Sequence, residues 1–326
     1  MRNVCVIGGS RYFGRHLIEL FLEAGIAVTV VNRGSVPAPP GATRLVADRD
    51  DEAALRAALG PRTFDAVVDQ VCYTPAQAAV ACRVFADRTP RYVMTSTMEV
   101  YDPATGAPAG KAPGVPPGVP SGAPCTEDRV DPAAVPVDLA LPWRDLREPA
   151  RRWGEATAYA EGKRQAEAVF TRDAPFAFAT VRSAHVLGGG ALDFTGRLAH
   201  YVERIAAGRP VGVHRAPRAT SFVHHREIAA FLFWAATSGV TGPLNACSHG
   251  ELTVTELCGL VAGAVGTRRP RYRIAGQGGG TASPFSFDRY YALDNGRASA
   301  AGFGFSRVTD WLPGAVAEAL TSTEGV

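Results

Sequence analysis

Short apolar runs alternate with longer amphipathic stretches through the first half of the chain. The short runs are rich in β-branched residues and end at glycine, proline or polar residues, as buried strands do. The longer stretches repeat their apolar residues every three to four positions, which is typical of helices that cover one face of a sheet. This alternation predicts an α/β protein with a doubly wound parallel sheet. The expected strands are Asn3–Ile7, Ala27–Val31, Ala66–Asp69, Arg91–Thr95 and Phe178–Val181, and the expected helices are Arg15–Ala24, Asp50–Leu59, Pro75–Ala86 and Trp153–Phe170.

Residues 102–150 interrupt the alternation with 11 of the 24 prolines of the chain. Proline lacks the amide hydrogen that helix interiors and central strands require, so we expect neither element here. Two interpretations stay open, a mobile surface insertion and a lid or loop that contacts substrate. The last third mixes short strands with helices such as Glu227–Ala236 and Thr255–Val265.

The composition excludes several classes of protein. Hydrophobic residues make up 46% and charged residues 20% of the 326 residues, as in ordinary globular proteins. A formal charge of +3 is too small to indicate a nucleic-acid or membrane partner. The six cysteines are scattered without a Cys-x-x-Cys spacing, which favours reduced thiols in a cytoplasmic protein.

A glycine-rich turn stands between the first expected strand and the first expected helix. Glycines there let the backbone turn sharply and approach a pyrophosphate, whose charge is stabilised by the helix N-terminus. The spacing differs from the usual dinucleotide fingerprint, because an arginine takes the place of the middle glycine. The cofactor-binding residues predicted here are Gly8, Gly9, Ser10, Arg11, Tyr12, Phe13 and Gly14.

The end of the second strand bears on the choice of cofactor. NAD enzymes usually place an acidic residue here to bind the ribose 2′-hydroxyl group, whereas this chain has Asn32 followed by Arg33. Asn32 does not repel a 2′-phosphate and Arg33, with Arg11, could attract one, so the sequence favours NADP while leaving NAD open. Asp48 is a candidate acceptor for the adenine amino group.

Tyr159 and Lys163 form a candidate catalytic pair inside an expected helix. The i, i+4 spacing places both on one face of the helix. A nearby ammonium group lowers the pKa of a phenol, so the tyrosine could exchange a proton with a substrate hydroxyl or carbonyl. Lys163 is also one of only two lysines against 32 arginines, a bias typical of GC-rich bacterial genomes.

These motifs resemble those of the extended and atypical short-chain dehydrogenases/reductases, the NAD-dependent epimerase/dehydratase superfamily. The resemblance covers most of the chain except the proline-rich insertion. It implies that Thr97 bonds the substrate oxygen beside Tyr159 and that Lys163 also holds the nicotinamide ribose. The segments that carry it are Gly8–Gly14, Thr95–Tyr101, Tyr159–Lys163, Val181–Gly188 and Phe222–Ala229.

Glu99 separates this sequence from simple 4-epimerases, which usually lack a glutamate here. Sugar 4,6-dehydratases and sugar-acid decarboxylases carry a glutamate at the corresponding position, and the sequence resembles them there. A carboxylate beside the substrate can remove a proton next to a transient ketone. On an extended strand, Thr97 and Glu99 would face the same side. Met98 takes the place of the acid that protonates the leaving group in dehydratases, and we expect it to contact substrate.

The expected phosphate side is also atypical. In the sugar-nucleotide enzymes that this segment resembles, an Arg-Asp pair stands where this chain has Thr220 and Ser221. Arg215 or Arg218 could compensate, and otherwise the substrate is a nucleoside or a free sugar. In the segment Val181–Gly188 the resemblance places Val186 at the cofactor and His185 at the substrate.

No metal site is expected from the sequence. His224 and His225 are adjacent, and adjacent residues on a strand point to opposite faces, so joint ligation is not expected.

The sequence thus predicts an NAD(P)-binding Rossmann domain over residues 1–182, which includes the insertion 102–150. Residues 183–326 are expected to form a smaller, mainly substrate-binding part, with some segments returning to the first domain. The leading hypothesis is a dehydratase acting on a sugar, nucleotide sugar or nucleoside. A ketoreductase, a sugar epimerase and, in another class, a non-catalytic nucleotide- or RNA-binding protein remain alternatives. The sequence does not indicate the oligomeric state, and a homodimer is one of the alternatives.

Overall fold

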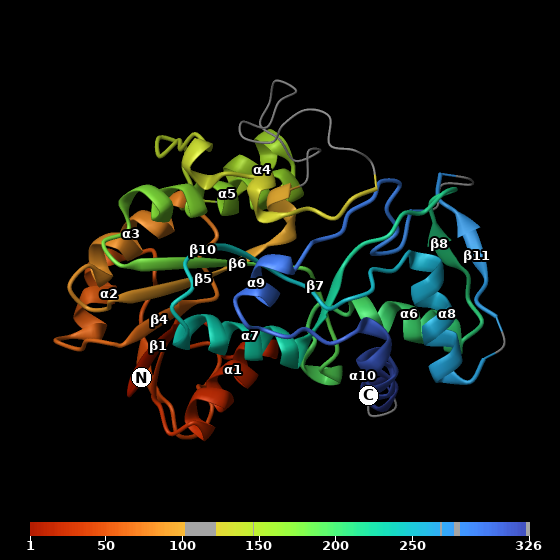
Figure 1. Ribbon diagram of the computed structural model, residues 1–326, viewed down its shortest axis with the longest axis horizontal. Helices are drawn as coiled ribbons and strands as arrows, with labels where there is room; N and C mark the ends of the chain where they lie inside the picture. The colour runs from red at the N-terminus through yellow and green to blue at the C-terminus, as the bar shows by residue number, and fades with distance from the viewer. Residues whose placement is uncertain (102–121, 146, 268, 277–280, 324–326) are drawn as a thin grey trace. The chain divides into compact units, whose positions relative to one another are not determined.

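The computed structural model describes residues 1–101, 122–145, 147–267, 269–276 and 281–323 (Figure 1). Residues 102–121 of the proline-rich insertion lie outside the described residues. The chain divides into two compact units. The first unit consists of Met1–Val119, Glu127–Ser183 and Ala229–Asn245, and the second of Pro120–Thr126, Ala184–Ile228 and Ala246–Val326.

The first unit is built on a seven-stranded sheet with the order β10-β6-β5-β4-β1-β2-β3. The neighbouring strands from β3 to β6 run parallel, and Val6 of β1 pairs with Val30 of β2 and Val68 of β4. The strand order reverses direction at β1, and ligands of open α/β sheets bind at the carboxyl ends of the strands beside such a point. The strands are β1 Asn3–Ile7, β2 Ala27–Asn32, β3 Thr43–Val46, β4 Ala66–Asp69, β5 Arg91–Thr97, β6 Ala177–Ser183 and β10 Gly242–Ala246.

Helices cover both faces of this sheet, which confirms the predicted doubly wound fold (Figure 1). Figure 1 shows α3 and α5 on one face and α1 and α7 on the other, where the rings of Phe21 and Phe233 lie 5.0 Å apart. The α-helices are α1 Tyr12–Glu23, α2 Glu52–Leu59, α3 Pro75–Phe85, α4 Arg147–Trp153, α5 Glu155–Asp173 and α7 His225–Thr237, and three 3-10 turns are η1 Met98–Tyr101, η3 Glu127–Arg129 and η4 Pro132–Ala134.

Helix α5 is held by an ion pair buried in the protein. The carboxylate of Glu167 lies 2.7 Å from the Arg182 guanidinium on β6, and both side chains are at most 1% exposed. Arg182 also donates to the carbonyl groups of Glu127 and Val130, both at 2.9 Å. Ser96 of β5 donates to Glu167 at 2.5 Å. One charged pair therefore ties α5, β5, β6 and the segment 127–130 together.

The described part of the insertion is packed. Trp143 is buried, its indole donates to the Asp138 carbonyl oxygen at 2.6 Å, and the Asp138 amide donates to Gln165 of α5 at 2.9 Å. Helix α4 begins at Arg147, so the expectation that no regular helix forms before residue 150 was wrong at its end. The expected helix Trp153–Phe170 corresponds to α5, except that Trp153 is the last residue of α4 and Gly154, with a φ of 85°, separates the two helices.

The second unit has its own apolar core. Strand β7 (His185–Leu187) pairs with β9 (Phe222–His224), and β8 (Val211–Val213) pairs with β11 (Tyr272–Ile274), all parallel. Helices α6, α8 and α10 pack against one another around buried leucines and valines. The helical elements of this unit are α6 Arg197–Ala206, α8 Val254–Val265, α9 Gly296–Ala300, α10 Val308–Thr323 and the 3-10 turn η5 Gly190–Leu192.

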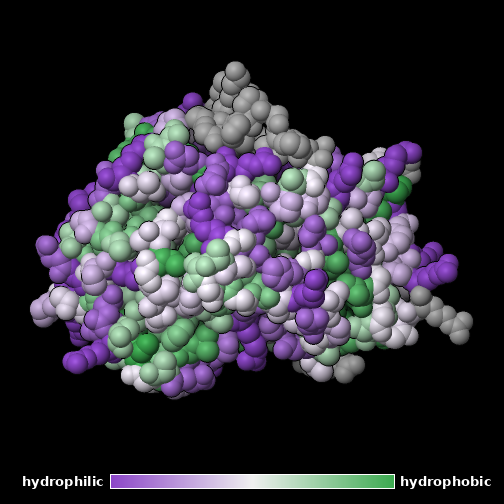
Figure 2. Space-filling view, viewed as in Figure 1, coloured by the Kyte–Doolittle hydropathy of each residue, from purple (hydrophilic) through white to green (hydrophobic). Residues whose placement is uncertain are grey.

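The surface is mixed in polarity. Figure 2 shows hydrophilic residues spread over the visible face with small hydrophobic areas between them. Among the described residues, no helix is both long enough and apolar enough to span a bilayer.

The buried pair generates a stability prediction. Replacing Arg182 with leucine leaves the Glu167 charge buried without its partner, so we expect the free energy of unfolding to fall by about 3–5 kcal/mol. Arg83→Leu is the control, because Arg83 forms a surface pair with Glu52 and is 56% exposed, and surface pairs contribute about 0–1 kcal/mol. Urea unfolding of both variants measures the difference. Equal losses in the two would contradict the anchoring role of the buried pair.

Candidate active site

The turn after β1 brings backbone segments into close approach. Gly8 and Gly9 have φ angles of 81° and 75°, a left-handed region that favours glycine. A Cβ atom on Gly14 would lie 2.5 Å from the Gly9 Cα atom, so a side chain cannot be accommodated there without a shift. The amide of Gly8 donates to the Val31 carbonyl of β2 at 2.8 Å. Gly8 and Gly9 are therefore favoured by their backbone conformation, and Gly14 is required by the close approach of the Gly9 backbone.

The N-terminus of α1 faces this turn. Arg11 occupies the N-cap position in an extended conformation, and its side chain makes no capping hydrogen bond. Tyr12 has a φ of 51°, an uncommon and strained value for a residue with a side chain, of the kind found at ligand-binding turns. Uncapped amides at the start of a helix bind phosphate groups. The glycine cradle and this helix start therefore fit the pyrophosphate of a dinucleotide.

Gln70 and Val71, which follow β4, support the turn from the neighbouring strand. A Cβ atom on Gly14 would lie 2.3 Å from the Gln70 Oε1 atom, and one on Gly8 would lie 2.7 Å from Val71. Sequence reasoning missed both residues. Their position directly after a parallel strand was the available signal, because ligand sites gather at the carboxyl ends of such strands.

Asn32 connects the glycine turn to the loop after β2. Its amide nitrogen donates to Ser10 Oγ at 2.9 Å and to the Val36 carbonyl at 3.1 Å, while its oxygen accepts from the Gly34 amide at 2.9 Å. Arg44 on β3, which sequence reasoning missed, donates to the Gly34 carbonyl at 2.6 Å. Asn32 therefore shapes this loop.

The charged residues predicted for the cofactor's adenosine end are exposed. Arg11 and Arg33 both lie at the surface, where their guanidinium groups can meet a bound anion. Asp48 is also exposed, and its carboxylate accepts a hydrogen bond from the Asp50 amide at 3.0 Å.

Lys163 and Tyr159 lie one turn apart on α5, as their spacing predicts. Lys163 is 2% exposed, whereas Tyr159 is 39% exposed and thus accessible to a substrate. The Lys163 ammonium donates to the Thr95 carbonyl of β5 at 2.8 Å and lies 5.9 Å from the centre of the Tyr159 ring. Burial lowers the pKa of Lys163 to about 8. An ammonium group is therefore fixed beneath an accessible phenol.

Tyr73 completes the surroundings of the lysine. Its ring lies 4.5 Å from the Lys163 ammonium and 6.2 Å from the Tyr159 ring. Gly162 permits this arrangement, because a Cβ atom on it would lie 2.3 Å from the Tyr73 carbonyl oxygen. Neither residue was singled out from the sequence, although a glycine inside a helix costs about 1 kcal/mol and often indicates close packing.

The segment after β5 differs from the sequence expectation. The strand ends at Thr97, and Glu99 lies in the 3-10 turn η1, so the strand argument that placed Thr97 and Glu99 on one side was wrong. Thr97 Oγ1 instead accepts a hydrogen bond from the Glu99 amide at 3.2 Å. Arg164 of α5 donates to the carbonyl groups of Val100 at 2.7 Å and Glu99 at 3.2 Å. Met98 is buried at the start of the turn.

The remaining predicted residues belong to the second unit. His185 is buried among the rings of Phe222, Phe285 and Phe287, and burial lowers its pKa to about 3, so the imidazole is neutral. Val186 is also buried. The exposed predicted cations of this unit are Arg215 and Arg218.

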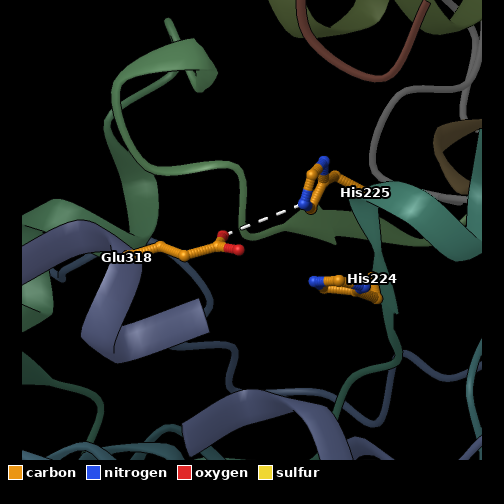
Figure 3. Close-up of side chains that lie close together, drawn as sticks. All are labelled: His224, His225 and Glu318. Carbon is orange, nitrogen blue, oxygen red and sulfur yellow. Dashed lines mark ion pairs between the residues drawn. The ribbon is translucent and has the colours of Figure 1, made fainter. Parts of the chain in front are cut away.

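His224 and His225 do not follow the alternation expected of a strand. Strand β9 ends at His224 and α7 begins at His225, so the two rings lie side by side with centroids 4.5 Å apart (Figure 3). The expectation that they point to opposite faces was wrong, because the backbone changes from extended to helical between them.

Known proteins resemble this chain in sequence and in fold. Residues 4–120 match the NAD dependent epimerase/dehydratase family. No curated protein matches the chain. Among solved structures, UDP-glucose 4-epimerase of Thermotoga maritima is 17% identical with a TM-score of 0.70, covering 99% of both chains. The dTDP-glucose 4,6-dehydratase of Bacillus anthracis is 13% identical with a TM-score of 0.70, covering 100% of this chain and 98% of its own.

A third solved structure, the enzyme WbmH of Bordetella bronchiseptica, is 18% identical with a TM-score of 0.66, covering 100% of this chain and 99% of its own. Identities this low show a shared fold. Residues 4–120 thus match the model of the NAD dependent epimerase/dehydratase family, and the chain as a whole has the fold of the solved epimerase and dehydratase structures.

Proposed function

We propose that this chain modifies a sugar, nucleotide sugar or nucleoside by transient oxidation of a carbinol, with Tyr159 as the acid/base. The observation that carries the proposal is the accessible Tyr159 phenol above the buried Lys163 ammonium. Both lie in the unit whose glycine cradle fits a dinucleotide. The structures of the dehydratase and of WbmH contain NAD or NAD+, which supports a nicotinamide cofactor.

The chain's own residues handle the protons of this reaction. A bound nicotinamide cofactor supplies reversible hydride acceptance at the carbinol carbon. Tyr159 takes the hydroxyl proton, and the Thr97 hydroxyl is available to bond the same oxygen. Lys163 stabilises the phenolate through its charge, since its ammonium is held by the Thr95 carbonyl.

Dehydration is the preferred reaction because of Glu99. Its carboxylate would take the proton next to the transient ketone and pass it to the β-hydroxyl group, which would leave as water. The hydride held by the cofactor would then return to the unsaturated ketone. Arg164 fixes the turn that carries Glu99 by bonding its carbonyl oxygen. Glu99 is half-buried, which is compatible with contact to a bound substrate. The dehydratase among the structural relatives supports this choice, and the epimerases among them support the alternative of epimerisation.

The phosphate side limits the substrate. Thr220 and Ser221 are both buried, and Ser221 Oγ accepts a hydrogen bond from the Leu293 amide at 2.9 Å. They offer no positive charge to a diphosphate. Arg215 and Arg218 are exposed cations of the same unit and are our candidates for that role. A nucleotide sugar requires them, whereas a nucleoside or a free sugar does not.

Product analysis tests the proposed function. Incubation with a panel of nucleotide sugars, free sugars and nucleosides should convert one of them with loss of one water, detected by mass spectrometry. Tyr159→Phe should lower turnover by about 10²–10⁴-fold, because it removes the acid/base group. Tyr272→Phe is the control, since this tyrosine lies in the second unit and is 42% exposed. Near-normal turnover in Tyr159→Phe would contradict the role of Tyr159 as the acid/base.

Arg33 provides a test of cofactor choice. If a 2′-phosphate binds there, Arg33→Ala should weaken NADP binding at least about tenfold and leave NAD binding almost unchanged, since only NADP carries that charge. Arg44→Ala is the comparison, because Arg44 already bonds the Gly34 carbonyl and its loss should affect both cofactors alike. Calorimetry with each cofactor measures the effect. An equal loss for NAD and NADP in Arg33→Ala would reverse the choice.

Glu99 provides a test of the elimination step. Glu99→Gln should still permit oxidation, so reduced cofactor should accumulate with absorbance at about 340 nm. Deuterium from solvent should no longer enter the substrate, because the proton acceptor is gone. Glu148→Gln, at an exposed glutamate of the same unit, should behave as the unmodified protein. Normal turnover and normal deuterium incorporation in Glu99→Gln would favour the reductase alternative.

A further inference from the structure

Three side chains of the second unit that have no role in the proposed reaction gather at one point. His224 ends β9, His225 begins α7, and Glu318 lies on α10. One potential ligand atom from each lies within 4.8 Å of the others. The Glu318 carboxylate points toward His225, with an oxygen–nitrogen distance of 3.8 Å (Figure 3).

The neighbouring glycine loop fits closely around this group. Gly188 has a φ of 95°, and a Cβ atom on it would lie 2.9 Å from both imidazole rings. The Gly189 amide donates to the Glu318 carboxylate at 2.8 Å. The loop thus leaves room for both rings and orients the carboxylate, which is how outer groups fix ligands at metal sites.

Helix α10 contributes a second contact to the same group. Trp311 packs on the His224 ring with centroids 5.2 Å apart. Trp311 and Glu318 are seven residues apart, or about two turns, and therefore lie on one face of the helix. One helix face thus holds the ring of one histidine and presents a carboxylate to the other.

The donor set selects a class of ion. Two imidazoles with one carboxylate suit Zn²⁺ and neighbouring transition ions, whereas Mg²⁺ and Ca²⁺ prefer oxygen ligands alone. Bonds of about 2.1 Å in a tetrahedral site place ligand atoms roughly 3.4 Å apart. The widest-spaced of the three atoms, within 4.8 Å of one another, must therefore close by up to about 1.4 Å, to which rotation of the imidazole rings and movement of the Glu318 side chain, 41% exposed, can contribute.

We propose that His224, His225 and Glu318 bind a divalent transition ion of the Zn²⁺ class. Three protein ligands leave a fourth position for water. The ion would link α10 to the junction of β9 and α7, and so couple its binding to the stability of the second unit. This proposal does not depend on the proposed function, since none of the three residues takes part in it.

Calorimetric titration of the metal-free full-length protein with Zn²⁺ tests the proposal. We expect one ion per chain and a raised melting temperature. His225→Gln and Glu318→Gln should each weaken binding by at least about tenfold, because each removes a ligand. His249→Gln and Glu203→Gln are matched controls, since both residues are exposed in the same unit and lie outside the group.

Cobalt(II) distinguishes these ligands from cysteine. The bound ion should show d–d bands without the near-ultraviolet charge-transfer band of a thiolate. Absence of Zn²⁺ binding, a thiolate band, or affinity unchanged in both ligand variants would each overturn the proposal. If His225→Gln fails to fold, the Zn²⁺ affinity of Glu318→Gln still tests the proposal, because Glu318 is partly exposed while His225 is buried.

Discussion

The ion pair between Glu167 and Arg182 determines where helix α5 can lie. Burying two charges is costly, and the cost is offset only when further hydrogen bonds satisfy both groups. Here the guanidinium bonds Glu167, two carbonyl groups and the Tyr101 hydroxyl, while the carboxylate accepts from Ser96 as well. Because Glu167 lies one turn beyond Lys163 on the same helix, this network also fixes the ammonium group beside Tyr159.

The sequence predicted those elements whose conformation depends mainly on residues close together in the chain. Strand β1 was predicted with its bounds, because a buried parallel strand is a continuous apolar run ended by glycine. The glycine turn and the pair of Tyr159 and Lys163 were also readable, since turn conformation and helical spacing are properties of neighbouring residues. Strand β3 was missed, because three of its four residues are exposed or polar and give no apolar run.

Contacts between distant segments escaped sequence reasoning. Tyr73 reaches Lys163 only because Gly162 lets two segments ninety residues apart approach each other. The change from strand to 3-10 turn at Met98 depends on Arg164, which bonds two carbonyl groups of that turn from α5. The histidine pair was misjudged for the same reason, since the end of β9 is set by tertiary packing and not by the pattern of apolar residues.

We propose that oxidation at the carbinol is transient, so that the cofactor is restored in each turnover. The most direct measurement is the ratio of product formed to nicotinamide cofactor consumed, with one converted substrate and a limiting amount of cofactor. Many molecules of product should form for each molecule of cofactor, with no net change in the amount of reduced cofactor. Consumption of one reduced cofactor for each product would contradict this proposal and would identify the protein as a reductase.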